Sequence, residues 1–219
     1  MINRYMNETL MEQRLVNEGH RSVVGGMWEV IGPLQRDFLV SQGLRPDHNL
    51  LDVGCGSLRG GVPLTGFLNA NRYYGIDISK LLLDVGYERE IQRTELAAKL
   101  PRDHLFATDS FEVPFDATFD FGIAVSLFTH LPLSMFTRCL TNIAPRFAPG
   151  SLLFATVFEG EGSIFRPSGV TTHDDKDPFH FTRENLVKAT PPQWNFHWYG
   201  EWGHPRGQLM VRLTRTAHD

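Results

Sequence analysis

The chain has 219 residues, 42% of them hydrophobic, which suits one α/β domain with a substantial core. Its formal net charge of -4 and the absence of any run of lysine or arginine argue against nucleic acid as a partner. With two cysteines and no apolar stretch of about 18 residues, we expect no disulfide framework, signal peptide or membrane partner, and a cytoplasmic location.

Residues 1–49 precede the first predicted strand and are expected to hold two helices. Four apolar residues of the second helix recur at helical spacing: Trp28, Ile31, Leu34 and Phe38. Gly43 suits the end of this helix because glycine adopts the left-handed conformation readily. We therefore divide the chain into an N-terminal helical cap over the ligand cleft, residues 1–49, and a main domain, residues 50–219.

The stretch from Leu50 to Gly61 is the most informative part of the chain. An apolar run ends there in the turn Gly54-Cys55-Gly56, and a second apolar run ends in Asp77, about 20 residues further on. Glycines let the backbone turn tightly and approach a ligand that a Cβ would block. A helix after such a turn directs its free N–H groups at an anionic part of the ligand. The pattern is typical of a nucleoside-cofactor site.

Asp52 indicates which cofactor binds. Its carboxylate, two residues before the first glycine, would repel the pyrophosphate of a dinucleotide, whereas it would attract the amine and sulfonium of an amino-acid cofactor. The segment Leu51-Asp52-Val53-Gly54-Cys55-Gly56 resembles the first motif of class I S-adenosylmethionine-dependent methyltransferases. Asp77 resembles the acid with which this family binds the ribose.

The resemblance covers residues 44–160. It continues through three later motifs: Thr108-Asp109-Ser110, Phe119 to Ser126, and Ala148-Pro149-Gly150-Ser151. The chain departs from the family at Leu58, where members often carry a third glycine. The resemblance implies S-adenosyl-L-methionine as the cofactor. It also implies a Rossmann-like, doubly wound α/β sheet of seven strands, mostly parallel with an antiparallel C-terminal hairpin.

Apolar runs and helical patterns alternate along the main domain. Strands are expected at 50–53, 73–77, 104–108, 119–126 and 151–158, and helices near 60–69, 80–98 and 132–147. Ser79 is the expected N-cap of the helix at 80–98. Such alternation implies a parallel sheet covered on both faces, with ligands bound beyond the carboxyl ends of its strands.

The last third of the chain follows a different pattern. Residues 159–181 are rich in Gly, Pro, Asp and His, and we expect them to form a functional loop or mobile lid. A capped helix is expected to begin at Thr182. Strands at 194–201 and 207–214 then form a predicted hairpin, which matches the antiparallel close of the family's sheet.

The resemblance also assigns cofactor contacts. Asp52 and the backbone of Gly54, Cys55 and Gly56 are expected at the methionine end, Asp77 with Ile78 at the ribose, Asp109 with Ser110 at the adenine, and Arg59 and Ser126 complete the set. Three of these residues have a structural alternative. Asp77 could cap a helix, Asp109 could serve only as a turn residue, and Arg59 could be a solvated first-turn arginine.

Methyl transfer from a sulfonium is a direct displacement, in which alignment lowers the barrier and a general base helps when the acceptor loses a proton. His130 is the leading catalytic candidate because it follows the fourth strand, where the methyl group should lie, and because imidazole titrates near neutrality. Three rival bases, each with a structural role as its alternative, are His173, His180 and His204. Ser126 stands where metal-dependent catechol-type members carry a carboxylate, so we expect no metal.

Three residues are predicted to contact the substrate: Trp28, Arg21 and Trp202. N-terminal helices often cover the substrate cleft in this fold, and Arg21 would suit an anionic acceptor or simply end a surface helix. Four late aromatic residues share even parity: Trp194, Phe196, Trp198 and Trp202. They form either sheet core or an aromatic wall for a flat acceptor.

The predicted function is methyl transfer from S-adenosylmethionine to a small-molecule acceptor, at oxygen rather than at nitrogen or carbon. No Asn-Pro-Pro-Tyr-like element follows the fourth strand, which disfavours methylation of nucleobase and glutamine amino groups. A protein or peptide acceptor is the first alternative. A nicotinamide-dinucleotide oxidoreductase and a non-catalytic cofactor-binding protein are the others. The sequence does not indicate an oligomeric state.

Overall fold

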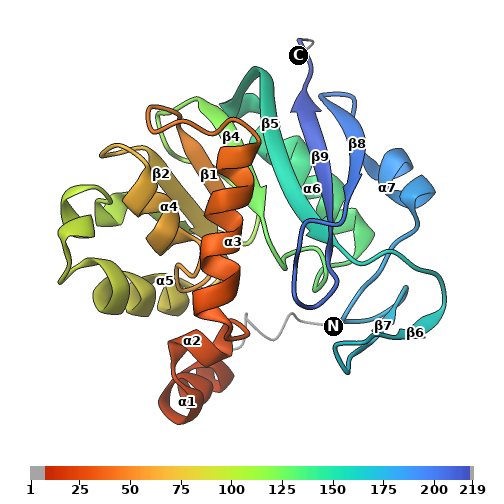
Figure 1. The fold of residues 1–219 in the computed structure, drawn as a ribbon, viewed down its shortest axis with the longest axis horizontal. Helices are drawn as coiled ribbons and strands as arrows, with labels where there is room; N and C mark the ends of the chain where they lie inside the picture. Colours follow the sequence, from red (N-terminus) through yellow and green to blue (C-terminus); the bar gives the residue numbers. More distant parts are fainter. Residues whose placement is uncertain (1–7, 218–219) are drawn as a thin grey trace. The chain divides into compact units, whose positions relative to one another are not determined.

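Seven strands form one mixed sheet in the order β3-β2-β1-β4-β5-β9-β8, and β6 and β7 form a separate sheet, in the computed structural model of the chain (Figure 1). The structure describes residues 8–217. The strands are β1 Leu50–Val53, β2 Tyr73–Asp77, β3 Leu105–Ala107, β4 Phe119–Ala124, β5 Phe147–Val157, β6 Ser163–Phe165, β7 Thr171–His173, β8 Trp194–Gly200 and β9 Leu209–Arg215. This architecture confirms the predicted fold class.

Seven α-helices accompany these strands within residues 8–217: α1 Glu8–Glu18, α2 His20–Val23, α3 Trp28–Ser41, α4 Gly61–Phe67, α5 Lys80–Gly86, α6 Leu133–Ile143 and α7 Arg183–Ala189. The chain divides into two compact units. The first runs to Asp109 and includes residues 114–116, and the second holds residues 110–113 and the chain from Ala117 onward.

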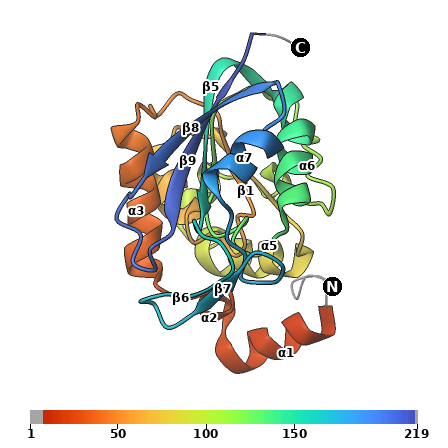
Figure 2. The ribbon, with the colours of Figure 1, turned by 90° about the vertical axis from the view of Figure 1, so that its right-hand side faces the viewer.

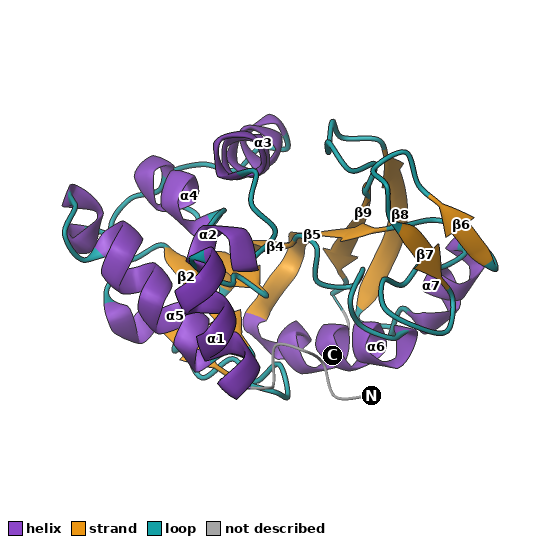
Figure 3. Cartoon of the chain, turned by 90° about the horizontal axis from the view of Figure 1, so that it is seen from below, coloured by secondary structure: helices purple, strands orange, loops and turns teal. Residues whose placement is uncertain are grey.

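The first unit is built on the parallel strands β1, β2 and β3. All four residues of β1 are buried, as expected for a parallel strand that is covered on both faces. Figure 3 shows α4 and α5 on opposite sides of β2. Ser79 accepts a hydrogen bond from the Leu82 N–H, 3.3 Å between the heavy atoms, and so confirms the predicted N-cap of α5.

Residues 8–49 of the predicted cap hold three helices rather than two, and residues 1–7 lie outside the described residues. Met11 of α1 and Val23 of α2 pack against Leu82 of α5 in one apolar cluster. On α3, Ile31 and Phe38 of the predicted stripe are buried. Gly43 has a φ of 98°, which confirms the left-handed helix end.

The predicted helix at 80–98 is shorter than expected. After α5 the chain continues as a π-helix at Tyr87–Ile91 and, after a break, as a 3₁₀ turn at Glu95–Ala98. The Thr94 side chain accepts a hydrogen bond from the Leu96 N–H and starts that turn, so local capping competes with helix continuation. π-Helical turns are rare and are often found at functional sites.

The second unit contains the parallel pair β4 and β5 and the antiparallel pairs β5–β9 and β9–β8. The two late strands confirm the predicted hairpin. Strand β5 begins at Phe147, earlier than predicted, because Phe119 pairs with Phe147 before a register shift in the ladder. Helices α6 and α7 lie side by side (Figure 2), joined by a hydrogen bond from the Thr137 hydroxyl to the Ala189 carbonyl.

The segment at residues 159–181 is more ordered than a long irregular loop. Strands β6 and β7 form an antiparallel hairpin in which Ile164 pairs with Thr172. Backbone hydrogen bonds from Phe181 N–H to Phe158 O and from Phe179 N–H to Thr129 O join the end of the segment to its surroundings. Thr182 accepts a hydrogen bond from the Asn185 N–H, 3.1 Å away, and confirms the predicted start of α7.

Candidate functional site

The glycine-rich turn after β1 contains three left-handed residues. Gly54 and Gly56 have φ values of 76° and 56°, which glycine adopts without steric cost. Leu58, which replaces the family's third glycine, has a φ of 73° and is fully buried. A left-handed leucine costs about 1–2 kcal/mol. The burial of the Leu58 side chain therefore has to offset the cost of this left-handed conformation.

Residues of the N-terminal region cover this turn within the first unit. A Cβ added to Gly56 would lie 3.0 Å from Cγ1 of Val24, so the Val24 side chain packs against the glycine backbone where a larger residue would crowd it. The Ser57 hydroxyl donates to the His20 carbonyl at 3.2 Å. The Nη1 group of Arg59 donates to the carbonyls of Val24 and Gly26, at 3.0 and 3.1 Å.

Arg59 therefore has a role that the sequence did not suggest. It is 8% exposed, so its interpretation as a solvated first-turn arginine is wrong. Its hydrogen bonds join the glycine-rich turn to the segment between α2 and α3, over 35 and 33 residues of sequence. A contact of Arg59 with the cofactor stays a prediction.

Asp77, at the end of β2, binds the backbone of the turn. Its carboxylate accepts from the Gly56 N–H at 2.8 Å and from the Ser79 N–H at 2.9 Å. Burial raises the pKa of this carboxyl group, and the backbone hydrogen bonds oppose that rise. The contact with Ser79 agrees with the helix-capping alternative, while further lone pairs of the same carboxylate suit ribose hydroxyls.

Asp52 lies beneath the turn, on β1. It is 4% exposed and accepts a hydrogen bond of 2.7 Å from the hydroxyl of Tyr73 on β2. Burial raises the pKa of Asp52 to about 7, and the nearby charge of Asp77 adds to the rise. Burial likewise raises the pKa of the neighbouring Cys55 thiol. Tyr73 is a site residue that the sequence analysis missed, because its position in a buried strand indicated only core packing.

These residues fit the cofactor that the resemblance implies. The turn offers glycine backbone that packs closely against neighbouring groups. Two carboxylates stand on adjacent parallel strands, buried Asp52 on β1 and partly exposed Asp77 at the end of β2. Desolvation raises the pKa of both, and such carboxylates favour a ligand that carries positive charge, such as an ammonium or a sulfonium. Ile78 is partly exposed beside Asp77, and Asp109 is exposed after β3. Ser110 belongs to the second unit, where its carbonyl accepts a hydrogen bond from the Asn142 side chain.

Arg21 and Trp28, two predicted substrate residues, lie in a polar cluster of the first unit. The Arg21 guanidinium forms two hydrogen bonds of 2.8 Å with Glu90 and lies 4.6 Å from the centre of the Trp28 ring. His20 Nε2 lies 3.2 Å from the same Glu90 carboxylate. Glu90, which sequence reasoning missed, belongs to the π-helix. The cluster joins α2 and the start of α3 to the helix after β2.

His130 lies in the second unit, on the loop after β4, and its partner is a carboxylate. Its Nδ1 is 2.5 Å from Oδ1 of Asp177, and His130 is partly exposed while Asp177 is exposed. Sequence analysis did not select Asp177, which is the last acid of a polar run before Pro178. No local signal links it to a histidine 47 residues earlier.

The three rival histidines have structural contacts in the second unit. His180 is fully buried, and its Nδ1 lies 2.8 Å from the Thr172 hydroxyl within the β6–β7 hairpin. His173 Nδ1 lies 2.9 Å from the Ser163 hydroxyl. His204 is buried and accepts a hydrogen bond from the Arg206 N–H at Nδ1. These contacts favour the structural alternative for all three.

Ser126, two residues after the end of β4, is held by a buried polar network of the second unit. Its φ of 60° is unusual for serine, and its N–H donates to the Thr156 hydroxyl at 2.7 Å. The Gln208 side chain accepts from the Thr156 hydroxyl at 2.7 Å and donates to the Ser126 hydroxyl at 3.0 Å. Gln208 is a further residue that the sequence analysis missed. Left-handed residues held in this way are often found at functional sites.

The four late aromatic residues do not form one continuous face. Trp194 is buried and donates to the Leu140 carbonyl of α6, and Trp198 packs under the Arg183 guanidinium of α7. A register shift follows Trp198, so the even parity ends before Trp202. Trp202 is buried and donates to the Gln208 carbonyl at 3.0 Å. Sheet packing therefore explains Trp194, and a substrate contact of Trp202 stays a prediction.

Residues 8–217 lack two kinds of feature. No helix in that range combines the length and apolar character needed to cross a membrane. The same range holds no group of three or more His, Cys, Asp or Glu side chains placed to bind a metal ion. The expectation that the protein uses no metal stays a prediction.

Comparisons with known proteins agree with the motifs and the fold. A family model described as a methyltransferase domain matches residues 51–155. The magnesium protoporphyrin IX methyltransferase (ChlM) from Synechocystis PCC 6803 with bound SAM is similar with a TM-score of 0.65 at 15% identity, over 95% of this chain and 97% of that chain. The DhpI–SAH complex has a TM-score of 0.64 at 16% identity, over 100% of both chains.

A third similar structure is the pyocyanin biosynthetic protein PhzM, with a TM-score of 0.66 at 16% identity, over 94% of this chain and 61% of that chain. At these identities the likeness to solved structures concerns the fold. The family model adds the glycine-rich turn and the strands that follow it. A methyltransferase domain at residues 51–155, and a seven-stranded fold similar to that of a methyltransferase with bound SAM, are consistent with the class I S-adenosylmethionine-dependent methyltransferase family.

Proposed function

We propose that this methyltransferase acts on a hydroxyl group of a small-molecule acceptor, with His130 as the general base. The contact between His130 and Asp177 carries the proposal, because a histidine paired with a carboxylate is suited to accept a proton and to stabilise the resulting charge. A neutral amine attacks a methyl group with its free lone pair, whereas a hydroxyl oxygen is a weak nucleophile until its proton begins to leave. The reaction rate of a hydroxyl acceptor therefore gains most from a general base.

The first unit would hold the cofactor, which supplies an electrophilic methyl group when bound. Asp77 would bind the ribose hydroxyls, and the turn at Gly54 and Gly56 would receive the amino-acid end near Asp52. The segment that Arg59 holds over the turn would exclude water from this end of the ligand. Under this assignment, residues 8–49 would serve as the helical cap.

The second unit would supply the proton acceptor. In the neutral ring, an Nδ1–H that donates to Asp177 leaves Nε2 as the acceptor. The network of Thr156 and Gln208 would hold Ser126 at the end of β4, four residues before the base. Each of these groups has a fixed partner, which favours the alignment that direct displacement requires.

The test is a transfer assay with methyl-labelled S-adenosylmethionine and a panel of small molecules that offer hydroxyl, amine or carbon nucleophiles. We expect label on hydroxyl compounds. His130→Ala should lower the rate by about 10²- to 10⁴-fold and leave cofactor affinity nearly unchanged. His197→Ala, an exposed histidine of β8, is the matched control and should keep the wild-type rate.

Other outcomes separate the alternatives. Label recovered only in added peptides or proteins would replace the small-molecule acceptor. Full activity of His130→Ala toward a hydroxyl acceptor would remove the base from the proposal. Tight cofactor binding without transfer to any acceptor class would favour a non-catalytic cofactor-binding protein.

A further inference from the structure

Asp177 approaches His130 as part of a larger backbone contact. The Phe179 N–H, two residues after Asp177, donates to the Thr129 carbonyl at 2.8 Å, directly beside His130. Thr129 is itself 1% exposed. Two adjacent residues of the loop after β4 are thus bound by residues 177–179, one through its carbonyl and one through its side chain.

The backbone around Asp177 is also tied to the β6–β7 hairpin. The Pro178 carbonyl accepts from the His173 N–H, and the His180 N–H donates to the His173 carbonyl, both at 2.8 Å. Fully buried His180 then contacts Thr172 of the same hairpin. These backbone contacts limit the positions that the Asp177 carboxylate can take. Its approach to His130 therefore depends on how the backbone around it is held, and not on a chance meeting of two flexible surface side chains.

The neighbouring acids do not share this contact. Asp174 accepts a hydrogen bond from the Gly162 N–H at 3.3 Å, and Asp175 is exposed. Of the three aspartates between His173 and Pro178, only Asp177 lies at the His130 ring. A general attraction between the His130 ring and the acidic run would not favour one of these three aspartates over the others.

An ionised carboxylate accepts hydrogen bonds and donates none, so the Nδ1 atom facing Asp177 must carry the proton. We propose that Asp177 is a positioning residue, which fixes the tautomer and the orientation of His130 so that Nε2 is the proton acceptor. This inference rests on the proposed function, in which His130 is the base. Asp177 itself touches neither acceptor nor cofactor in this role and acts only through the histidine.

The test reads the tautomer directly and requires no acceptor. Long-range ¹H–¹⁵N correlation spectra of the ¹⁵N-labelled full chain at a pH where histidine is neutral distinguish Nδ1–H from Nε2–H rings, and His130→Gln assigns the signal. We expect Nδ1–H for His130 in the wild-type protein. Asp177→Ala should convert most of this population to Nε2–H, and Asp175→Ala should leave it unchanged.

Three spectral results would overturn the proposal: an Nε2–H ring in the wild-type protein, an unchanged ring in Asp177→Ala, or an equal change in Asp175→Ala. Because alanine removes a contact between two segments, Asp177→Asn serves as a second variant that keeps the shape and loses the charge. It should fold like the wild-type protein, as judged by its thermal unfolding.

Kinetics complete the test once an acceptor is known. Asp177→Asn should lower kcat at least about tenfold, because part of the contribution of a general base is lost, while the KM for the cofactor stays the same. An unchanged kcat would overturn the positioning role. Failure of the proposed function is recognised separately, since His130→Ala would then keep full activity whatever the tautomer in the wild-type protein.

Discussion

Asp52 combines burial, a hydroxyl partner and a neighbouring carboxylate at a single residue. The Tyr73 hydroxyl donates to it, yet desolvation outweighs that bond and raises the pKa from 3.8 to about 7. With a pKa of about 7, Asp52 is therefore partly protonated near neutral pH. A cationic ligand group beside it would favour the ionised form.

This shift predicts a pH-dependent stability. Between pH 4 and 7, approximately, the folded protein holds a proton on Asp52 that the unfolded chain has released, so the free energy of unfolding falls as pH rises through that window. A pKa change from 3.8 to about 7 corresponds to about 4 kcal/mol. Asp52→Asn keeps an acceptor for Tyr73 and removes the titration. Relative to the wild-type protein, it should gain stability steadily as pH rises in urea unfolding, and parallel pH curves would contradict the assignment.

At the scale of elements, the connection between α2 and α3 is bound to the glycine-rich turn mainly through Arg59. Its two carbonyl acceptors lie in the segment that the turn must approach. The contacts of His20 and Arg21 with Glu90 bind α2 to the π-helix at Tyr87–Ile91. Both sets of contacts tie residues 20–26 to other elements of the first unit.

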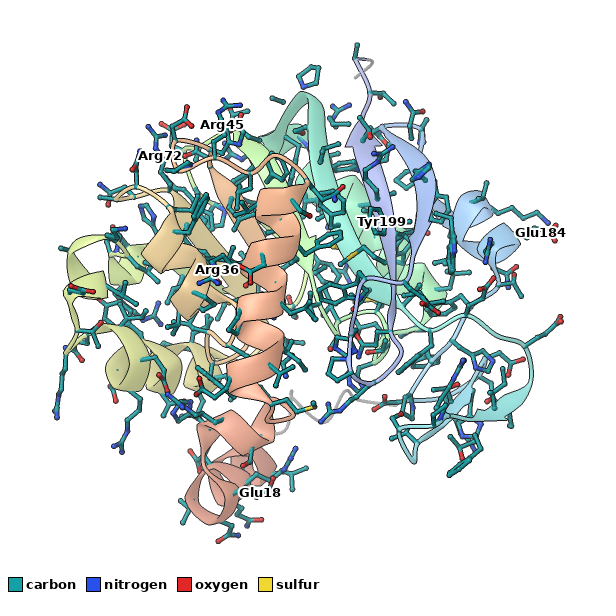
Figure 4. All side chains as sticks on the ribbon, viewed as in Figure 1. Glu18, Arg36, Arg45, Arg72, Glu184 and Tyr199 are labelled. Carbon is teal, nitrogen blue, oxygen red and sulfur yellow. The ribbon has the colours of Figure 1, made fainter. Side chains whose placement is uncertain are left out.

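Arg59→Met should loosen this segment while keeping most of the apolar packing of the side chain. Loss of charge-assisted hydrogen bonds worth about 1.5–3 kcal/mol should speed hydrogen exchange of peptides that cover residues 19–27 by about tenfold or more. The matched control is Arg45→Met, an exposed arginine of the same unit that pairs with Asp47 (Figure 4). Unchanged exchange in these peptides would show that Arg59 does not hold the segment.

At the scale of the whole molecule, cofactor binding is linked to stability because only the folded chain presents the assembled turn. A ligand at about 100 times its Kd stabilises by about 2.7 kcal/mol. For a chain of this size that corresponds to a rise in Tm of about 5–10 °C. S-adenosylmethionine should produce this rise, and a nicotinamide dinucleotide should not.

Asp77→Ala is the informative variant for this measurement. It should lose about 1.5–3 kcal/mol of binding free energy and therefore about half to nine-tenths of the rise in Tm at the same ligand concentration. Asp116→Ala, which removes an exposed acid of the same unit, should retain the full rise. An equal rise in both variants would reject Asp77 as a ribose-binding residue.

Local signals in the sequence determined much of the fold. Leu50–Val53 and Tyr73–Asp77 match the predicted strands because short, mainly apolar runs end there in glycine and aspartate. Ser79 and Thr182 cap helices as predicted, since an N-cap depends on residues within one helical turn. The glycine-rich turn and its acid were recognisable for the same reason. Each is a short pattern whose conformation its own residues favour.

Contacts between distant residues were decided only by the tertiary structure. Arg59 binds carbonyls more than 30 residues away, and Asp177 meets a histidine 47 residues earlier. Leu58 holds a left-handed conformation that its own preference opposes. In each case the contacting residues are brought together by the packing of whole elements. A short stretch of sequence contains only one side of such a contact. The sequence therefore specified the cofactor turn, while the partner of the proposed base became visible only when the chain was folded.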